Sequence, residues 1–131
     1  MSDVTKVVVI IYDNYENVLV VQNQKNKSGT PEIWSLLRRD IKGKETAEKC
    51  ANKAVDHDLN SIIFNLESFK LYQEQDCSVT EVFRGNLKGK TVLHKSLYDL
   101  KWINVKELDN YEFKGEDKSI IMSFVEEHRF K

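Results

Sequence analysis

Two short apolar runs open the chain, and a few polar residues separate them. Val7 to Tyr12 and Val18 to Gln22 are rich in β-branched residues, which favour strands. Asp13, Asn14 and Asn17 lie between the runs and are residues that favour turns. We therefore expect the two runs to form strands that pair with each other as a β-hairpin.

A polar loop and then a helical pattern follow. The loop is Asn23 to Glu32, which contains Pro31, the only proline of the chain, and leads to Trp34. From about Thr46 to Leu59, apolar residues recur on one stripe of a helix, while charged residues occupy the rest of its surface. This spacing predicts an amphipathic helix over 46–59.

The second half of the chain predicts more strands and a closing helix. Three segments have the composition of strands: Ile62 to Tyr72, Val79 to Leu87 and Lys101 to Val105. Residues 87–92 (LKGKTV) predict a turn, and Lys106 to Asp109 predicts a helical turn. Asp117 to Phe130 predicts a helix whose acidic start and basic end suit the helix dipole. The order of these elements predicts an α+β domain with a mixed β-sheet flanked by helices.

Composition and charge narrow the classes of function. A chain of 131 residues that is 40% hydrophobic and 31% charged is expected to fold as a single domain over 1–131. Its formal net charge of -1 gives no global positive field, so we expect no nucleic acid and no membrane as partners. Cys50 and Cys77 are the only cysteines and lack the spacing of a disulfide framework. Reduced thiols and a cytoplasmic location are therefore expected.

Four features along the chain together resemble the Nudix hydrolases. They are the VVVIIYDNYENVLVVQ segment, the WSLL segment that starts at Trp34, Glu45 in front of the amphipathic helix, and a late Trp102 in LKWINVKEL. The resemblance covers nearly the whole chain and implies a Nudix-like α/β/α sandwich. It also implies metal-assisted cleavage of a nucleoside diphosphate linked to another group, with Mg²⁺ or Mn²⁺ as the cofactor.

The Nudix signature, Gx5Ex7REUxEExGU with U a bulky apolar residue, fits this chain without a gap but with many replacements. When Glu45 is placed on the first Glu, Lys53 falls on the Arg and Ala54 on the Glu that follows it. Val55 then falls on the apolar position, His57 and Asp58 on the paired Glu residues, and Asn60 on the closing Gly. Only Glu45 and Val55 match outright. Lys53 and Asp58 retain the charge of the residues that they replace, and Asn60 suits the left-handed geometry of a helix cap.

The replaced positions are those that hold the metal in the family. Positions 54, 57 and 58 project from a helix as one cluster, which with Glu residues forms a magnesium site. Ala54 offers no ligand, His57 offers a nitrogen and Asp58 keeps an oxygen, which argues against a family-type multi-magnesium centre. The resemblance leaves Glu45, His57 and Asp58 as candidate metal ligands. It leaves Glu45, Lys53 and Asp58 as candidate catalytic residues, with Lys53 orienting the helix or neutralising charge.

Basic residues stand in front of Glu45. Arg38 and Arg39 occupy the glycine positions of the family's Pro-Gly-Gly segment, and four lysines lie nearby in the sequence: Lys25, Lys27, Lys42 and Lys44. Arginine binds phosphate bidentately, whereas a glycine loop approaches it with backbone amides. We therefore interpret Leu37 to Arg39 as part of a loop in which Arg38 and Arg39 contact phosphate.

Plainer interpretations stay open for several of these residues. Ala54 suits a buried helix position, and His57 beside Asp58 at a helix end is typical of a solvated histidine. The basic segment RRDIKGK is also typical of a solvated loop. Three residues are either exposed on strands or candidates for the additional carboxylate that the family places outside the box: Glu74, Glu81 and Asp99.

Three functions follow from these alternatives. The first is a Nudix-type hydrolase whose degenerate box leaves weak or absent activity. The second is a nucleotide- or phosphate-binding module that performs no hydrolysis, and the third is an interaction scaffold that uses only the fold. The expected partner is a nucleotide or another phosphate-bearing small molecule, and the sequence leaves a homodimer open.

Overall fold

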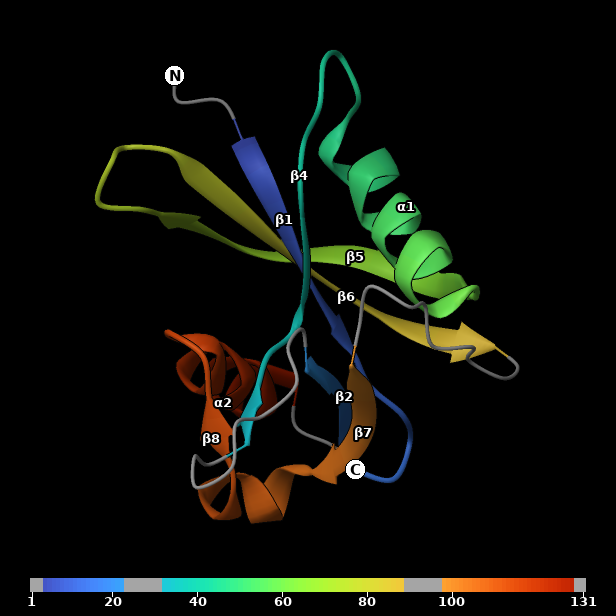
Figure 1. Cartoon of the computed structure of the whole chain (residues 1–131), viewed down its shortest axis with the longest axis vertical. Helices are drawn as coiled ribbons and strands as arrows, with labels where there is room; N and C mark the ends of the chain where they lie inside the picture. The colour runs from blue at the N-terminus through green and yellow to red at the C-terminus, as the bar shows by residue number, and fades with distance from the viewer. Residues whose placement is uncertain (1–3, 23–31, 89–97, 129–131) are drawn as a thin grey trace.

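The computed structural model describes residues 4–22, 32–88 and 98–128 (Figure 1). Its strands are β1 (Val4–Ile11), β2 (Asn17–Gln22), β3 (Ile33–Trp34), β4 (Leu37–Asp40), β5 (Ile62–Gln73), β6 (Val79–Lys88), β7 (Asp99–Asn104) and β8 (Glu112–Phe113). Its helices are α1 (Ala47–Leu59), the 3₁₀ helix η1 (Val105–Asn110) and α2 (Asp117–His128). The predicted loop over 23–32, except Glu32, lies outside the described residues, as do residues 89–92 of the predicted turn over 87–92, whose first two residues belong to β6.

A four-stranded mixed sheet lies at the centre of the fold, with the strand order β4-β1-β6-β5. Strand β1 runs antiparallel to β4 and parallel to β6, and β5 runs antiparallel to β6. Two smaller sheets pair β2 with β7 and β3 with β8. The mixed sheet with helices beside it confirms the predicted α+β class (Figure 1).

From Val7 to Ile11, strand β1 is buried on both faces, which explains why its sequence there is apolar rather than alternating. Val7, Val9 and Ile11 belong to one core, which also contains the inward face of α1. Val8 and Ile10 belong to a second core, which contains residues of α2. Because successive side chains of a strand point to opposite faces, α1 and α2 cover opposite faces of the sheet. This arrangement is the predicted α/β/α sandwich.

Capping residues set the ends of α1. The side chain of Thr46 accepts a hydrogen bond from the backbone N–H of Lys49 at 3.2 Å. Asn60 takes the left-handed conformation with φ 48°, and its N–H donates to the carbonyl of Asp56. The predicted helix and the cap role of Asn60 are confirmed, and α2 confirms the closing helix as far as His128. Neither described α-helix is long and apolar enough to cross a membrane.

The predicted hairpin between the first two strands is wrong, although both strands exist. Both edges of β1 are occupied, one by β4 and the other by β6, so β2 pairs with β7 instead. A single bridge between Tyr12 and Val18 is the remaining antiparallel contact at the turn. Local turn chemistry predicts where the chain reverses, but distant strands decide the pairing.

The predicted loop over Leu37 to Arg39 is also wrong, because these residues belong to strand β4. Arg39 lies opposite Val7 and Arg38 lies opposite Val8 in an antiparallel register with β1. Burial of Leu37 in the core beneath α1 and pairing with β1 outweigh the weak strand preference of the charged residues. The two-residue strands β3 and β8 are too short to give a periodic signal and were not predicted.

The other predicted elements agree with the structure. Strands β5, β6 and β7 correspond to the three later strand predictions, with small differences at their ends. The predicted helical turn over 106–109 is part of η1.

Gly85 is required where β6 meets an irregular stretch of β5. A Cβ atom at this position would lie 2.7 Å from the Ile63 side chain and 2.9 Å from the Phe64 carbonyl oxygen. We expect Gly85→Ala to lower the free energy of unfolding by about 1–3 kcal/mol, because the backbone carbonyl cannot move away cheaply. Urea denaturation measures this change, and an unchanged or higher midpoint would contradict it.

Candidate functional site

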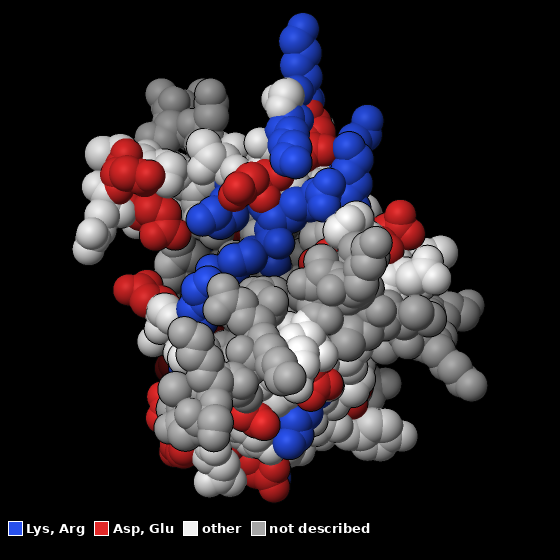
Figure 2. Space-filling view, in the orientation of Figure 1, with Lys and Arg blue, Asp and Glu red and all other residues white. Residues whose placement is uncertain are grey.

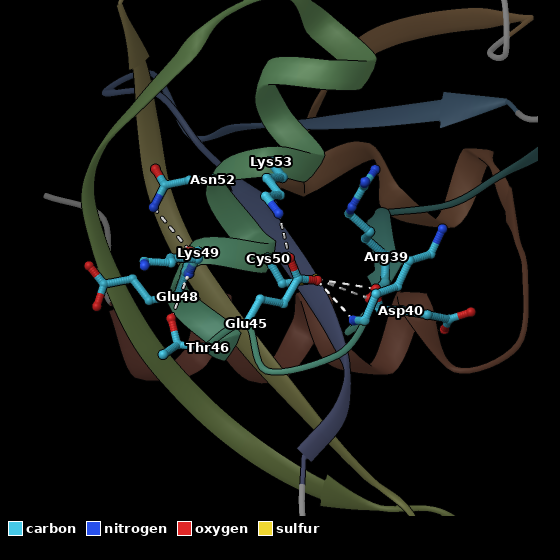
Figure 3. Close-up of polar contacts among 10 residues, drawn as sticks. Arg39, Asp40, Glu45, Thr46, Glu48, Lys49, Cys50, Asn52 and Lys53 are labelled. Carbon is cyan, nitrogen blue, oxygen red and sulfur yellow. Dashed lines mark hydrogen bonds and ion pairs between the residues drawn. The ribbon is translucent and has the colours of Figure 1, made fainter.

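Glu45 and Lys53 form the centre of the candidate site, at the start of α1. The Oε2 atom of Glu45 accepts a hydrogen bond from Lys53 Nζ at 2.8 Å (Figure 3). Its Oε1 atom accepts one from the backbone N–H of Lys42 at 2.9 Å. The Glu45 side chain is 9% exposed, whereas that of Lys53 is 58% exposed. Lys53 therefore neutralises Glu45 and ties the β4–α1 loop to the helix.

These hydrogen bonds hold Glu45 in its charged form. The hydrogen bond from Lys53, then that from Lys42, lowers the pKa of Glu45 from 4.5 to about 2, and burial opposes the shift only in part. A carboxylate with so low a pKa is a weak base. Both of its oxygens are already engaged, so the arrangement suits a structural ion pair better than proton transfer.

Cys50 lies directly beside this pair and was not predicted as part of the site. Its buried thiol donates to the backbone carbonyls of Asp40 at 3.5 Å and Arg39 at 3.7 Å. Burial, followed by the charge of Glu45, raises the pKa of the Cys50 thiol from 9.0 to about 11. The thiol therefore stays protonated at neutral pH and fastens α1 to β4. In the sequence, its place on the apolar stripe marked it only as a core residue.

His57 and Asp58 lie at the other end of α1. His57 Nδ1 lies 2.7 Å from Asp58 Oδ1, so these two predicted residues contact each other. Ala54, one turn before them, is 1% exposed and belongs to the interior. The carboxylate of Glu45 is engaged by Lys53 and by the Lys42 N–H, whereas that of Asp58 is engaged by His57. The two carboxylates are therefore held by different partners.

The donor set does not fit the magnesium ions that the fold family implies. Magnesium prefers several oxygen ligands in octahedral geometry at about 2.1 Å. Around positions 54, 57 and 58 the chain supplies a methyl group, a half-exposed imidazole and one carboxylate. Within residues 4–22, 32–88 and 98–128, no group of three His, Cys, Asp or Glu side chains is arranged to hold a metal.

The structure places Arg38 and Arg39 on opposite faces of the sheet. Arg38 faces α2, where its guanidinium pairs with Asp117, which is 2% exposed. Asp117 also accepts a hydrogen bond from the backbone N–H of Leu36 at 2.9 Å. Arg39 faces α1, because it lies on the same side of β4 as the buried Leu37. Sequence reasoning did not identify Asp117, since nothing in the sequence links the start of α2 to β4.

A basic surface covers β4 and the loop that leads into α1. Figure 2 shows Lys and Arg side chains gathered over this part of the molecule. Arg39 is half-buried, and Lys42 and Lys44 are exposed. Within the described part of the chain, none of these three forms an ion pair through its side chain. The predicted local positive charge is therefore present, although on a strand and its following loop.

A cavity of about 610 Å³ lies on the other face, between the tip of the β5–β6 hairpin and the start of α2. Its charged lining residues are Lys6, Arg38, Glu74, Asp76, Glu116 and Asp117. Carboxylates outnumber cations there, and Arg38 is already paired with Asp117. The cavity therefore suits an uncharged polar group, such as a sugar or a base, better than a phosphate.

The three predicted additional carboxylates lie apart from one another. Glu74 lines the cavity and accepts a hydrogen bond from Thr80 Oγ1 at 3.0 Å. Glu81 lies in β6 opposite Val7, and therefore on the face of the sheet that α1 covers. Asp99 is exposed at the start of β7. The structure does not gather them around the ends of α1.

Solved structures identify the fold. A MutT structure from work on Aliivibrio salmonicida and Vibrio cholerae has a TM-score of 0.78 at 10% identity, covering 95% of this chain and 98% of that chain. The NUDIX domain of Shewanella oneidensis NrtR, complexed with ADP ribose, has a TM-score of 0.76 at 15% identity, covering 98% and 90%. A NUDIX hydrolase from Nitrosomonas europaea has a TM-score of 0.72 at 12% identity, covering 97% and 89%. The sequence itself matches no protein-family model and no curated protein.

These likenesses show that the chain has the Nudix fold. The resemblance predicted from the sequence is therefore confirmed at the level of the fold. The identities are too low to carry over an activity, because one fold hosts many functions.

The lowered pKa of Glu45 predicts how the pair responds to acid. Its stabilising contribution is complete above about pH 4.5 and is lost as the pH falls toward 2, because Glu45 is protonated through this range. We expect Glu45→Gln to remove this dependence while Gln keeps an oxygen for the Lys42 N–H. Urea unfolding between pH 2 and pH 5 compares the two proteins, and parallel curves would contradict the assignment.

The two thiols are expected to react very differently. Cys50 is buried and protonated, whereas Cys77 is exposed. A disulfide reagent should therefore modify one thiol of the folded protein rapidly and both thiols in urea. The Cys77→Ser variant should lose the rapid phase, and rapid labelling that persists in this variant would show that Cys50 is accessible.

Proposed function

We propose that this Nudix-fold protein binds a phosphate-bearing small molecule, most simply a nucleotide, and that family-type hydrolysis is weak or absent. The observation that carries this proposal is the exchange of charge at the site. Ala54 supplies no ligand for a metal, Lys53 neutralises the charge of Glu45, and Arg39 adds a positive charge in front of the helix. The site thus retains attraction for phosphate while it lacks the oxygen ligands of a magnesium cluster.

The loss of ligands affects hydrolysis more than binding. Metal-assisted hydrolysis needs an ion that makes an attacking water nucleophilic near neutral pH. Asp58 is the one carboxylate at the three cluster positions, and it already contacts His57. A lysine or arginine stabilises phosphate charge directly and needs no such ion. The catalytic roles predicted for Glu45, Lys53 and Asp58, and the Mg²⁺ or Mn²⁺ cofactor, stay predictions.

One comparison favours a nucleotide as the phosphate-bearing ligand. A Nudix domain with a TM-score of 0.76 to this chain binds ADP ribose, which combines phosphates with sugars and a base. The cavity beside Asp117 lies on the opposite face of the sheet from Arg39, so the choice of a nucleotide does not rest on it.

Ligand-induced stabilisation tests binding. The protein is heated with nucleoside triphosphates, dinucleoside polyphosphates, ADP-ribose and nucleotide sugars, each in EDTA and in magnesium. A ligand present at 100 times its Kd should raise the free energy of unfolding by about 2.7 kcal/mol, with a matching rise in Tm. We expect at least one compound to stabilise the protein in EDTA, and a panel without any shift would contradict the proposal.

The same panel, with magnesium or manganese, tests hydrolysis. We expect little or no release of phosphate or nucleotide at high protein concentration. Turnover in the range of about 1–1000 s⁻¹ that is usual for enzymes would contradict this part of the proposal. Asp58→Asn is the control, because any activity that needs its carboxylate would disappear in this variant.

A further inference from the structure

Arg39 of β4 and Lys53 of α1 both lie near Cys50, where α1 packs against β4. Figure 3 shows Lys53 reaching from α1 toward Glu45, and the Arg39 side chain reaching from β4 alongside the helix. Their charges both oppose the rise in the pKa of the Cys50 thiol, which places both cations near this sulfur. Arg39 therefore stands beside the face of α1 that carries Cys50 and, one turn later, Ala54.

Both side chains have donors available for a ligand. Arg39 is half-buried, and its Nε has no hydrogen-bond partner among the described residues. Lys53 Nζ has three N–H donors, and the contact with Glu45 is the one that the described structure records for it. A planar guanidinium and an ammonium near one another match the oxygens of a phosphate group.

We propose that Arg39 and Lys53 form a metal-free phosphate site on the surface where β4 meets α1, in which Glu45 competes with the ligand for Lys53. This inference rests on the proposed function. It specifies which side chains hold the phosphate and which residue limits their affinity for it. Arg38 is excluded from the site, because it is committed to the buried Asp117 on the opposite face of the sheet.

The competition follows from the local charges. Arg39 and Lys53 carry two positive charges, and the adjacent carboxylate of Glu45 cancels one of them. A phosphate that approaches Lys53 meets this carboxylate, which repels it and occupies one of the lysine donors. Removing the charge of Glu45 should therefore strengthen phosphate binding. A site that needed Glu45 as a metal ligand would respond in the opposite direction.

The test uses inorganic pyrophosphate as the probe, with EDTA present and binding measured by calorimetry. We expect the wild-type protein to bind it, and we expect Arg39→Ala to bind about tenfold more weakly or worse, because charged hydrogen bonds are lost. Glu45→Gln should bind about two- to fivefold more tightly, the range of an exposed ion pair. Added salt should weaken binding in all three proteins.

Matched controls separate the site from general surface charge. Arg84 pairs with Glu67 at 3.0 Å, and Lys70 pairs with Glu127 at 3.1 Å, both away from α1. Arg84→Ala and Lys70→Ala should leave pyrophosphate affinity unchanged. Arg39→Lys keeps the charge without the guanidinium fork and should bind pyrophosphate more weakly than wild type. This variant tests the guanidinium in a folded protein if Arg39→Ala fails to fold.

Several results would overturn the inference. They are equal affinity in wild type, Arg39→Ala and Arg39→Lys, weaker binding by Glu45→Gln, and pyrophosphate binding that requires magnesium. Each of these leaves the proposed function standing if nucleotides still stabilise the protein. A protein that no phosphate compound stabilises, with or without magnesium, would instead remove the proposed function itself.

Discussion

The antiparallel register between β4 and β1 is the constraint on which the candidate site depends. Leu37 and Arg39 face α1 while Arg38 faces α2, because neighbouring residues of a strand point to opposite sides. A shift of one residue would exchange the two arginines and expel Leu37 from its core. The buried thiol of Cys50 donates to the carbonyls of Arg39 and Asp40, so α1 is fastened to the same stretch of β4.

Within this frame, two ion pairs give the basic residues different roles. Asp117 is almost fully buried, so a ligand that drew Arg38 away would leave an uncompensated charge in the interior. The contact between Lys53 and Glu45 is different, because Lys53 is more than half exposed and Glu45 also accepts a hydrogen bond from the Lys42 N–H. Lys53 can therefore turn to a ligand without leaving Glu45 unpaired, whereas Arg38 holds the start of α2 against β4.

The sequence was informative about elements and much less so about their partners. Apolar periodicity located α1 and α2, and the turn chemistry of Asn60 placed the end of α1 correctly. The pairing of β1 and the inclusion of Arg38 and Arg39 in a strand depend on contacts between distant segments, which no local pattern reports. Asp117 lies 79 residues from Arg38, so their ion pair was beyond sequence reasoning.

The residues that replace the family's signature residues at the site all favour phosphate over a metal ion. Ala54 supplies no carboxylate at a position where the family has a Glu, so attraction for a metal ion is weaker. The positive charges of Arg39 and Lys53 repel such an ion. The same cations attract phosphate, because its charge is opposite to theirs. A metal ion can stabilise phosphate charge and also activate water, whereas a guanidinium provides only the first of these effects. Under the proposed function, this Nudix fold would therefore keep its attraction for a phosphate-bearing ligand while it lacks the ion that activates water.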